Sequence, residues 1–281
     1  MAPSADLIKV LIVAVIMIPA CISDWRKREA SEMHWALMGG AGMVLVALYG
    51  GGEIWARFMV VSGMAVMLFD LLVDRDGGAG EQSAIYAAIA ALFLIPAVMS
   101  DWDFRMIAIP ILATYTVMIL LYYFGLMKGG ADVICLIAMG MVFQHYPVLN
   151  GMPLIEPGTG IYDAVFLFPL FVLMIALVIT AVVMLIYFFV RNLRNGDTGT
   201  AMFFGYRMDL GDVPGSMVWP IQDIINGEPV TVWNAVDDPD VLQRLWDAGA
   251  ERIWVTPKIP FLIPIFAGFL FMVMIGNPLF I

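Results

Sequence analysis

Long apolar segments recur along this chain and leave few residues between them. We place eight of them, at residues 7–23, 34–50, 56–74, 82–99, 106–126, 132–146, 161–190 and 259–280. A helix of about 20 residues spans the ~30 Å hydrocarbon core of a bilayer. Charged residues make up 14% of the chain, whereas soluble domains carry about a quarter. The sequence therefore predicts an all-α polytopic membrane protein with about eight transmembrane helices.

Basic residues predict the orientation of these helices. If the N-terminus faces outside, all of the 14 Lys and Arg residues except Lys9, Arg57 and Arg105 fall on the cytoplasmic side. Basic residues near membrane segments favour that side. We therefore expect a multi-pass protein of the cell membrane with both termini outside.

The stretch between the last two apolar segments has a different composition. Residues 191–257 contain ten acidic and five basic side chains. Within them, Val230–Trp233 and Ile253–Thr256 are rich in β-branched and aromatic residues, which is typical of strands, and Asp240–Ala248 reads as a short helix. The predicted domains are a transmembrane helical domain at 1–190, a small mixed α+β acidic cytoplasmic domain at 191–257, and a C-terminal transmembrane helix at 258–281.

Two carboxylates stand at the ends of apolar segments. Asp132 opens the sixth segment, directly after Lys128-Gly129-Gly130-Ala131, and Asp24 closes the first. A carboxylate inside a membrane segment is costly and usually functional, and glycine lets another backbone approach closely. The predicted orientation places both aspartates on the cytoplasmic side, where a pair that shares one proton could activate water and polarise a carbonyl. The candidate catalytic dyad is Asp24 and Asp132, supported by Lys128, Gly129 and Gly130.

Both aspartates also have structural explanations. Asp24 could be neutralised by the basic run Arg26–Arg28 that follows it. Asp132 could be an N-cap, a position that Asp favours. The sequence alone leaves these alternatives open.

Other carboxylates compete with the pair. Glu81 follows a Gly-rich turn similar to the one before Asp132, and Asp101 lies in a loop that the predicted orientation places outside. We keep Glu81 and Asp101 as runner-up site residues. Asp70, near the end of the third segment, is expected to pair with Arg75 or to reach the membrane surface.

Metal and cofactor motifs are absent from the sequence. The chain has two cysteines and two histidines, none of them in a spacing that a zinc or redox site uses. We therefore expect no metal, no cofactor and no nucleic-acid partner, while the oligomeric state stays open.

Three regions of the chain together resemble a known family. They are Asp24–Glu29, an aspartate followed by a basic cluster; Gly129–Asp132, a Gly-x-hydrophobic-Asp motif; and residues 201–208 with 253–260. In this order they are similar to the archaeal preflagellin peptidases, relatives of type IV prepilin peptidases among the Gly-x-Gly-Asp intramembrane aspartic proteases. The resemblance implies a core of six membrane helices, so that roughly 56–99 would be an inserted hairpin.

The resemblance also implies a reaction and a partner. Such peptidases remove a short basic leader from preflagellin or pilin-like precursors at the cytoplasmic membrane face, embedded in the lipid bilayer. The acidic residues Asp237, Asp238 and Asp240 are expected to attract the basic leader. The alternative is an ion- or proton-coupled transporter that uses the same carboxylates.

Overall fold

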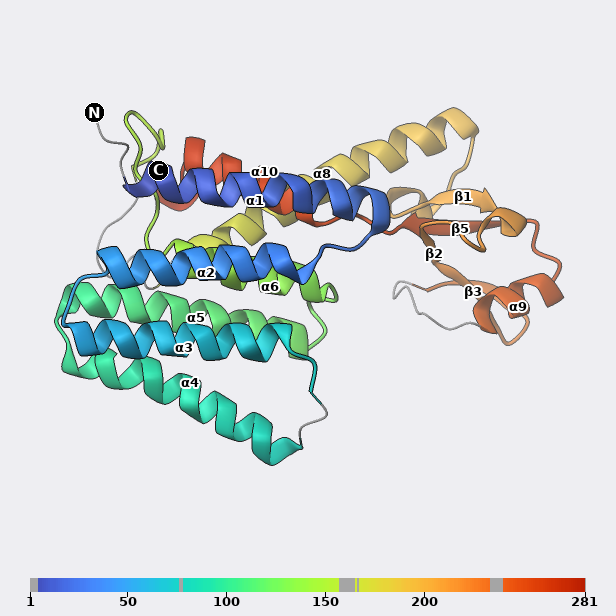
Figure 1. Cartoon of the computed structure of the whole chain (residues 1–281). Coiled ribbons are helices and arrows are strands. Elements are labelled where there is room, and N and C mark those ends of the chain that lie inside the picture. The colour runs from blue at the N-terminus through green and yellow to red at the C-terminus, as the bar shows by residue number, and fades with distance from the viewer. Residues whose placement is uncertain (1–4, 76–77, 157–164, 166, 233–239, 281) are drawn as a thin grey trace. The chain divides into compact units, whose positions relative to one another are not determined.

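The computed structural model describes residues 5–75, 78–156, 165, 167–232 and 240–280 (Figure 1). The chain forms two compact units. The first comprises Met1–Leu177 together with Pro260–Ile281, and the second comprises Val178–Ile259. The first unit is built from helices, and the second contains the strands.

Each of the eight predicted apolar segments contains a helix in the part of the chain that the structure describes. The helices are α1 (Ala5–Lys27), α2 (Glu32–Tyr49), α3 (Ile54–Leu72), α4 (Ala79–Met99), α5 (Trp102–Tyr123), α6 (Gly130–Val142), α8 (Phe168–Asn195) and α10 (Leu262–Met274). Five of these described helices, α1, α3, α4, α5 and α8, are long and apolar enough to cross a membrane. The prediction of a mostly helical, multi-pass membrane fold with a small α+β domain before the last helix is confirmed.

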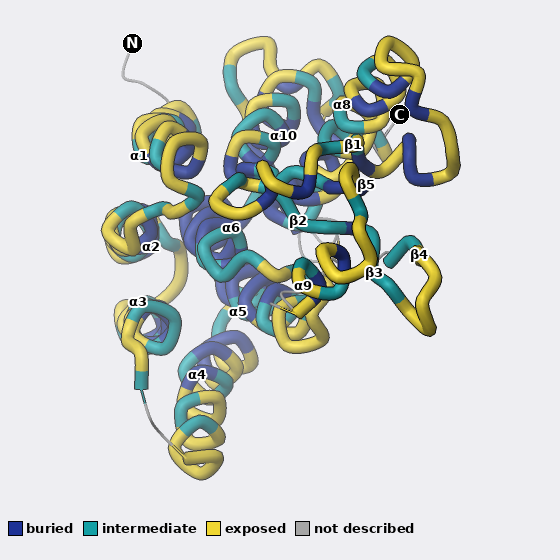
Figure 2. Tube along the Cα trace, turned by 90° about the vertical axis from the view of Figure 1, so that its right-hand side faces the viewer, coloured by how far each residue is buried: buried dark blue, intermediate teal, exposed yellow. Residues whose placement is uncertain are grey.

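Helix α6 occupies the middle of the first unit. It packs against α2, α5 and α1, and Val133 and Cys135–Val142 are all buried, which Figure 2 shows as dark blue coils. Glycines permit the close approach: a Cβ on Gly42 of α2 would lie 2.7 Å from the backbone of Met141. Small residues at such contacts are typical of membrane helix packing. A helix of only 13 residues, about 20 Å long, is therefore enclosed by longer neighbours.

Helices α3 and α4 form a hairpin on the outer side of this core. They pack against each other, and they join the rest of the unit through α2 and α5 (Figure 1). This hairpin covers the predicted insertion at 56–99.

The second unit contains two small sheets. Strands β1 (Tyr206–Asp209), β5 (Arg252–Pro257) and β2 (Val218–Pro220) form an antiparallel sheet in that order, and β3 (Gln222–Ile225) pairs with β4 (Glu228–Thr231). Helix α9 (Asp240–Asp247) contributes Val241 and Leu245 to a core that also contains Ile253 and Val255. Short 3₁₀ turns occur at Thr200–Phe203, Leu210–Asp212 and Pro278–Phe280.

The sequence predicted part of this domain. The strand at 253–256 and the helix at 240–248 are present as β5 and α9. The strand expected at Val230–Trp233 is observed as Glu228–Thr231, and Trp233 lies outside the described residues. Strands β1, β2 and β3 were not predicted, because each is only three or four residues long and contains acidic, amide or proline residues that are rare in strands.

An ion pair in the second unit makes its stability depend on pH. Arg244 of α9 donates hydrogen bonds of 3.0 and 2.8 Å to the two carboxylate oxygens of Asp223 in β3, and these bonds lower the pKa of Asp223. A carboxyl group whose pKa is lower in the folded state stabilises the fold above its unfolded pKa of about 3.9, and this contribution disappears as the pH falls through the folded value.

We therefore expect Asp223→Asn to increase hydrogen exchange of residues 222–231 severalfold over wild type at pH 6, with the two proteins converging below pH 4. Arg244→Gln breaks the same ion pair and serves as the reciprocal variant. Exchange is measured by mass spectrometry on the full chain in detergent, with each rate normalised for its intrinsic pH dependence. A difference that stays constant from pH 6 to pH 3 would contradict this account.

Candidate active site

Asp24 lies in the last turn of α1 and is buried, with 9% of its surface exposed. Its Oδ2 accepts a hydrogen bond of 3.1 Å from the backbone N–H of Leu262, the first residue of α10. Helix α10 has no side-chain cap of its own on Phe261, so the carboxylate satisfies one of its orphan N–H groups. The positive end of the α10 dipole also favours an anion at this position.

The basic cluster after Asp24 does not neutralise its carboxylate by direct pairing. Arg26 and Lys27 are exposed, and the chain turns at Arg28, which has a positive φ of 58°. The backbone N–H and the guanidinium of Arg28 both donate to the main-chain oxygen of Asp24, at 2.9 and 3.4 Å. Within the described residues no ion pair reaches the Asp24 side chain, which accepts its hydrogen bond from α10. The charge of Arg28 acts on this carboxylate from a greater distance.

Asp132 is the third residue of α6 and is half-buried. The N-cap of α6 is Gly129, so the alternative interpretation of Asp132 as the N-cap is wrong. The Asp132 side chain folds back over Gly129, and its Oδ2 lies where a Cβ on that residue would be. Gly129 therefore leaves the space that the carboxylate occupies, while a Cβ on Gly130 would meet nothing within 4 Å.

The structure brings the two aspartates into one neighbourhood. Helices α1 and α6 pack together. One turn after Asp132, the Cys135 thiol donates at 3.3 Å to the sulfur of Met17, which lies two turns before Asp24. The Asp24 and Asp132 carboxylates are close enough to interact electrostatically.

The runner-up carboxylates have other partners. Asp101 is the N-cap of α5, where its side chain accepts a 3.0 Å hydrogen bond from the Phe104 N–H. Glu81 is exposed in the first turn of α4 and lies 3.4 Å from Arg75. Lys128 is exposed just before α6.

The acidic residues expected to attract a leader lie elsewhere. Asp237 and Asp238 are outside the described residues, and Asp240 is the first residue of α9 in the second unit. Across the described residues, no three His, Cys, Asp or Glu side chains gather as a metal-ion site requires.

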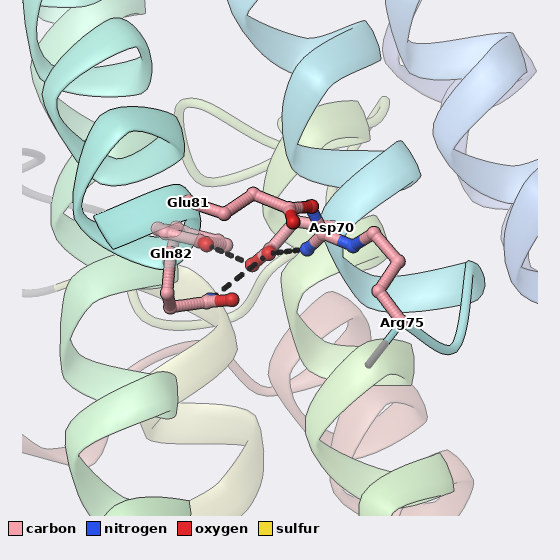
Figure 3. Close-up of polar contacts among 5 residues, drawn as sticks. Asp70, Arg75, Glu81 and Gln82 are labelled. Carbon is pink, nitrogen blue, oxygen red and sulfur yellow. Dashed lines mark hydrogen bonds and ion pairs between the residues drawn. The ribbon is translucent and has the colours of Figure 1, made fainter. Parts of the chain in front are cut away.

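Sequence reasoning missed two features of the first unit. One is the Leu262 N–H, a backbone group that no side-chain motif reveals. The other is a polar network around Asp70, whose expected pairing with Arg75 is observed at 2.5 Å. Gln82 also donates to Asp70, at 3.1 Å (Figure 3), and the Tyr115 hydroxyl donates to it at 2.6 Å. The only sequence signal was a carboxylate inside an apolar run.

Comparison with known proteins finds one family model that matches the C-terminal part of the chain. Residues 199–277 match the family model described as archaeal peptidase A24 C-terminus, type II. The match includes both C-terminal stretches of the resemblance, 201–208 and 253–260, and it supports the archaeal preflagellin peptidase family. An uncharacterized protein of Methanocaldococcus jannaschii is 23% identical over 272 residues, which are 94% of this chain and 91% of that protein. No solved structure matches the chain significantly.

The Asp24 contact to Leu262 predicts different costs for two substitutions. Asp24→Ala leaves the buried N–H without an acceptor and should destabilise the protein by about 1–3 kcal/mol. Asp24→Asn keeps an oxygen at the same position, so its cost should be clearly smaller. Thermal unfolding in detergent measures both.

A matched control is Asp6→Ala. Asp6 accepts a similar 3.0 Å hydrogen bond from the Val148 N–H, but at an exposed position where water can replace it. Its loss should cost about 0.5 kcal/mol or less. If Asp24→Ala and Asp24→Asn unfold at the same temperature, the hydrogen bond does not hold α10.

Proposed function

We propose that this chain, whose C-terminal part carries the archaeal peptidase A24 domain, is a membrane-embedded aspartic endopeptidase with Asp24 and Asp132 as its catalytic dyad. Its substrates are preflagellin or pilin-like precursors, from which it removes a short basic leader at the cytoplasmic membrane face. One observation carries the proposal. The family match at 199–277 includes Leu262, and the backbone of Leu262 binds the Asp24 carboxylate.

The proposed chemistry follows from two carboxyl groups that share one proton. The ionised carboxylate removes a proton from a water molecule, which attacks the carbonyl carbon of the scissile peptide bond. The protonated carboxyl donates to the carbonyl oxygen as the tetrahedral intermediate forms. Proton transfer to the leaving nitrogen then breaks the C–N bond and releases the amine and the new carboxylic acid.

Each neighbouring group has a role in this proposal. The Leu262 N–H fixes the orientation of Asp24 and leaves its other oxygen, Oδ1, for water or substrate. Gly129 gives the Asp132 carboxylate room to fold over the helix terminus. The open space beside Gly130 lets the backbone of a peptide approach the first turn of α6.

Two further lines support a precursor protein as the substrate. Several of the described helices are long and apolar enough to cross a membrane, which suits a substrate with a hydrophobic segment of its own. The predicted orientation puts both aspartates on the cytoplasmic side, where a leader is made.

Cleavage of a purified leader-bearing preflagellin by the reconstituted protein tests the proposal. Asp24→Asn and Asp132→Asn should each reduce kcat by about 10³-fold or more. When two residues act as one catalytic unit, removal of either one abolishes most of the activity. Glu81→Gln and Asp101→Asn should retain wild-type activity within about threefold, since neither side chain belongs to the dyad.

The pattern of losses separates the explanations. Loss with Glu81→Gln or Asp101→Asn in place of the dyad variants would identify a different carboxylate pair. Absence of cleavage by the wild type, together with proton or cation flux across proteoliposomes, would favour the transporter.

A pair of glycine variants tests the position of the Asp132 carboxylate. A methyl group at Gly129 occupies the space of Asp132 Oδ2 and must displace it, and a displacement of about 1 Å can cost 10²-fold in rate. Gly129→Ala should therefore lower kcat by about that factor with little change in thermal stability, since the far end of a side chain moves easily. Gly40→Ala in α2, where a Cβ would meet nothing within 4 Å, should lose at least tenfold less; equal losses would show that the space at Gly129 is unimportant.

A further inference from the structure

A second polar site lies in the first unit, between the α3–α4 hairpin, α5 and the first turn of α6. Its base is Asp70, whose side chain is only 5% exposed. Figure 3 shows Arg75, just after α3, and Gln82, in the first turns of α4, both reaching this carboxylate, while Glu81 lies beside Arg75. The Tyr115 hydroxyl of α5 completes the network. A carboxylate buried at this depth is expensive unless it is paired, and here three neighbours pair it.

This network forms one wall of a cavity of about 700 Å³. That volume lies within the range of small-ligand sites. Other walls come from Asp74, the rings of Tyr86, Tyr122 and Tyr123, and the apolar side chains Val133 and Ile134 of α6. The cavity therefore combines charged groups, aromatic faces and an apolar lining.

The charges of the cavity favour a cation. Arg75 is its one basic lining residue among the described residues, and it is already occupied by Asp70 at 2.5 Å and Glu81 at 3.4 Å. Asp74 is exposed and adds a further negative charge. Tyrosine faces attract ammonium and guanidinium groups. A lysine or arginine side chain fits this combination, because its aliphatic stem suits the apolar wall.

The cavity and Asp132 lie on different sides of the same helical turn. Val133 and Ile134 follow Asp132 directly, so successive rotations of about 100° carry them around α6 and away from its α1 side. A helix with its side chains is about 10–12 Å wide, and an extended peptide advances about 3.3 Å per residue. A peptide crossing the start of α6 would thus place in the cavity a residue about three or four positions from the bond at Asp132.

We propose that this cavity is a specificity site that binds a lysine or arginine side chain of the cleaved precursor, about three or four residues from the scissile bond. The inference rests on the proposed function for the identity of the peptide. It assigns the α3–α4 hairpin a role in substrate choice, through Asp70, Asp74, Arg75 and Tyr86.

Peptide binding tests the site separately from catalysis. The protein is the full-length Asp132→Asn variant in detergent, and the probes are a fluorescent leader peptide with lysine three or four residues from the cut and its Lys→Glu twin. We expect the lysine peptide to bind at least tenfold more tightly. Adding Asp74→Lys should abolish or reverse this preference, whereas adding Asp103→Lys should leave it intact.

Asp103 is the matched control, because it is an exposed acid in the first turn of α5 and gives the same change in net charge. The cavity lies at the opposite end of that helix, at Tyr122 and Tyr123. Equal affinity for the two peptides, or equal effects of the two charge reversals, would overturn the inference.

The binding results and the cleavage results can be combined. A lysine preference that depends on Asp74, in a wild type that cleaves no precursor, would support the cavity and refute the peptidase. Dyad-dependent cleavage with no such preference would support the peptidase and refute the cavity.

Discussion

The burial of α6 is the constraint on which the first unit depends. This helix is short and apolar, and nearly every residue after its first turn is buried by its neighbours. Its polar contribution is concentrated in the first turn, at Asp132, where the surrounding helices end. The packing that hides the rest of α6 therefore fixes where this carboxylate stands, and the glycines before it keep that place clear.

The hydrogen bond between Leu262 and Asp24 joins the beginning of the chain to its end. Helix α1 supplies the carboxylate and α10 supplies the N–H, across 238 positions of sequence. Because α10 begins without a side-chain cap, its first N–H takes the Asp24 carboxylate as its acceptor, and the buried carboxylate gains a hydrogen-bond donor. This contact explains how a C-terminal family domain can shape a site whose aspartates lie far from it in sequence. The proposed reaction uses an orientation that the fold already requires.

The apolar segments were predictable because a membrane helix has a strong compositional signature, and all eight contain helices in the described structure. Strand β5 and helix α9 were predictable for a related reason, since their residues agree with local preference. Strands β1 to β3 were not predictable from sequence. Their short polar sequences have little strand preference, and pairing with β5 and β4 stabilises them. Local sequence does not encode such long-range pairing.

The candidate site divides in the same way. Asp24 and Asp132 could be selected from sequence because charges beside apolar runs are rare. Two other features could not be predicted from sequence, because each depends on the three-dimensional structure. They are the capping of α10 by Asp24 and the position of the Asp132 carboxylate over Gly129. The Asp70 cavity combines residues from the four helices α3 to α6 and a loop, and the packing of α3 on α4, of α4 on α5 and of α5 on α6 brings them together.

The central claim is that Asp24 and Asp132 act as one catalytic unit, and a double-mutant cycle tests it most directly. The kcat/KM for preflagellin cleavage is compared among the wild type, Asp24→Asn, Asp132→Asn and the double variant. A shared-proton dyad predicts that each single variant is as inactive as the double variant, because neither carboxyl works alone. Losses that multiply, with measurable activity left in both single variants, would show two independent residues and contradict the account.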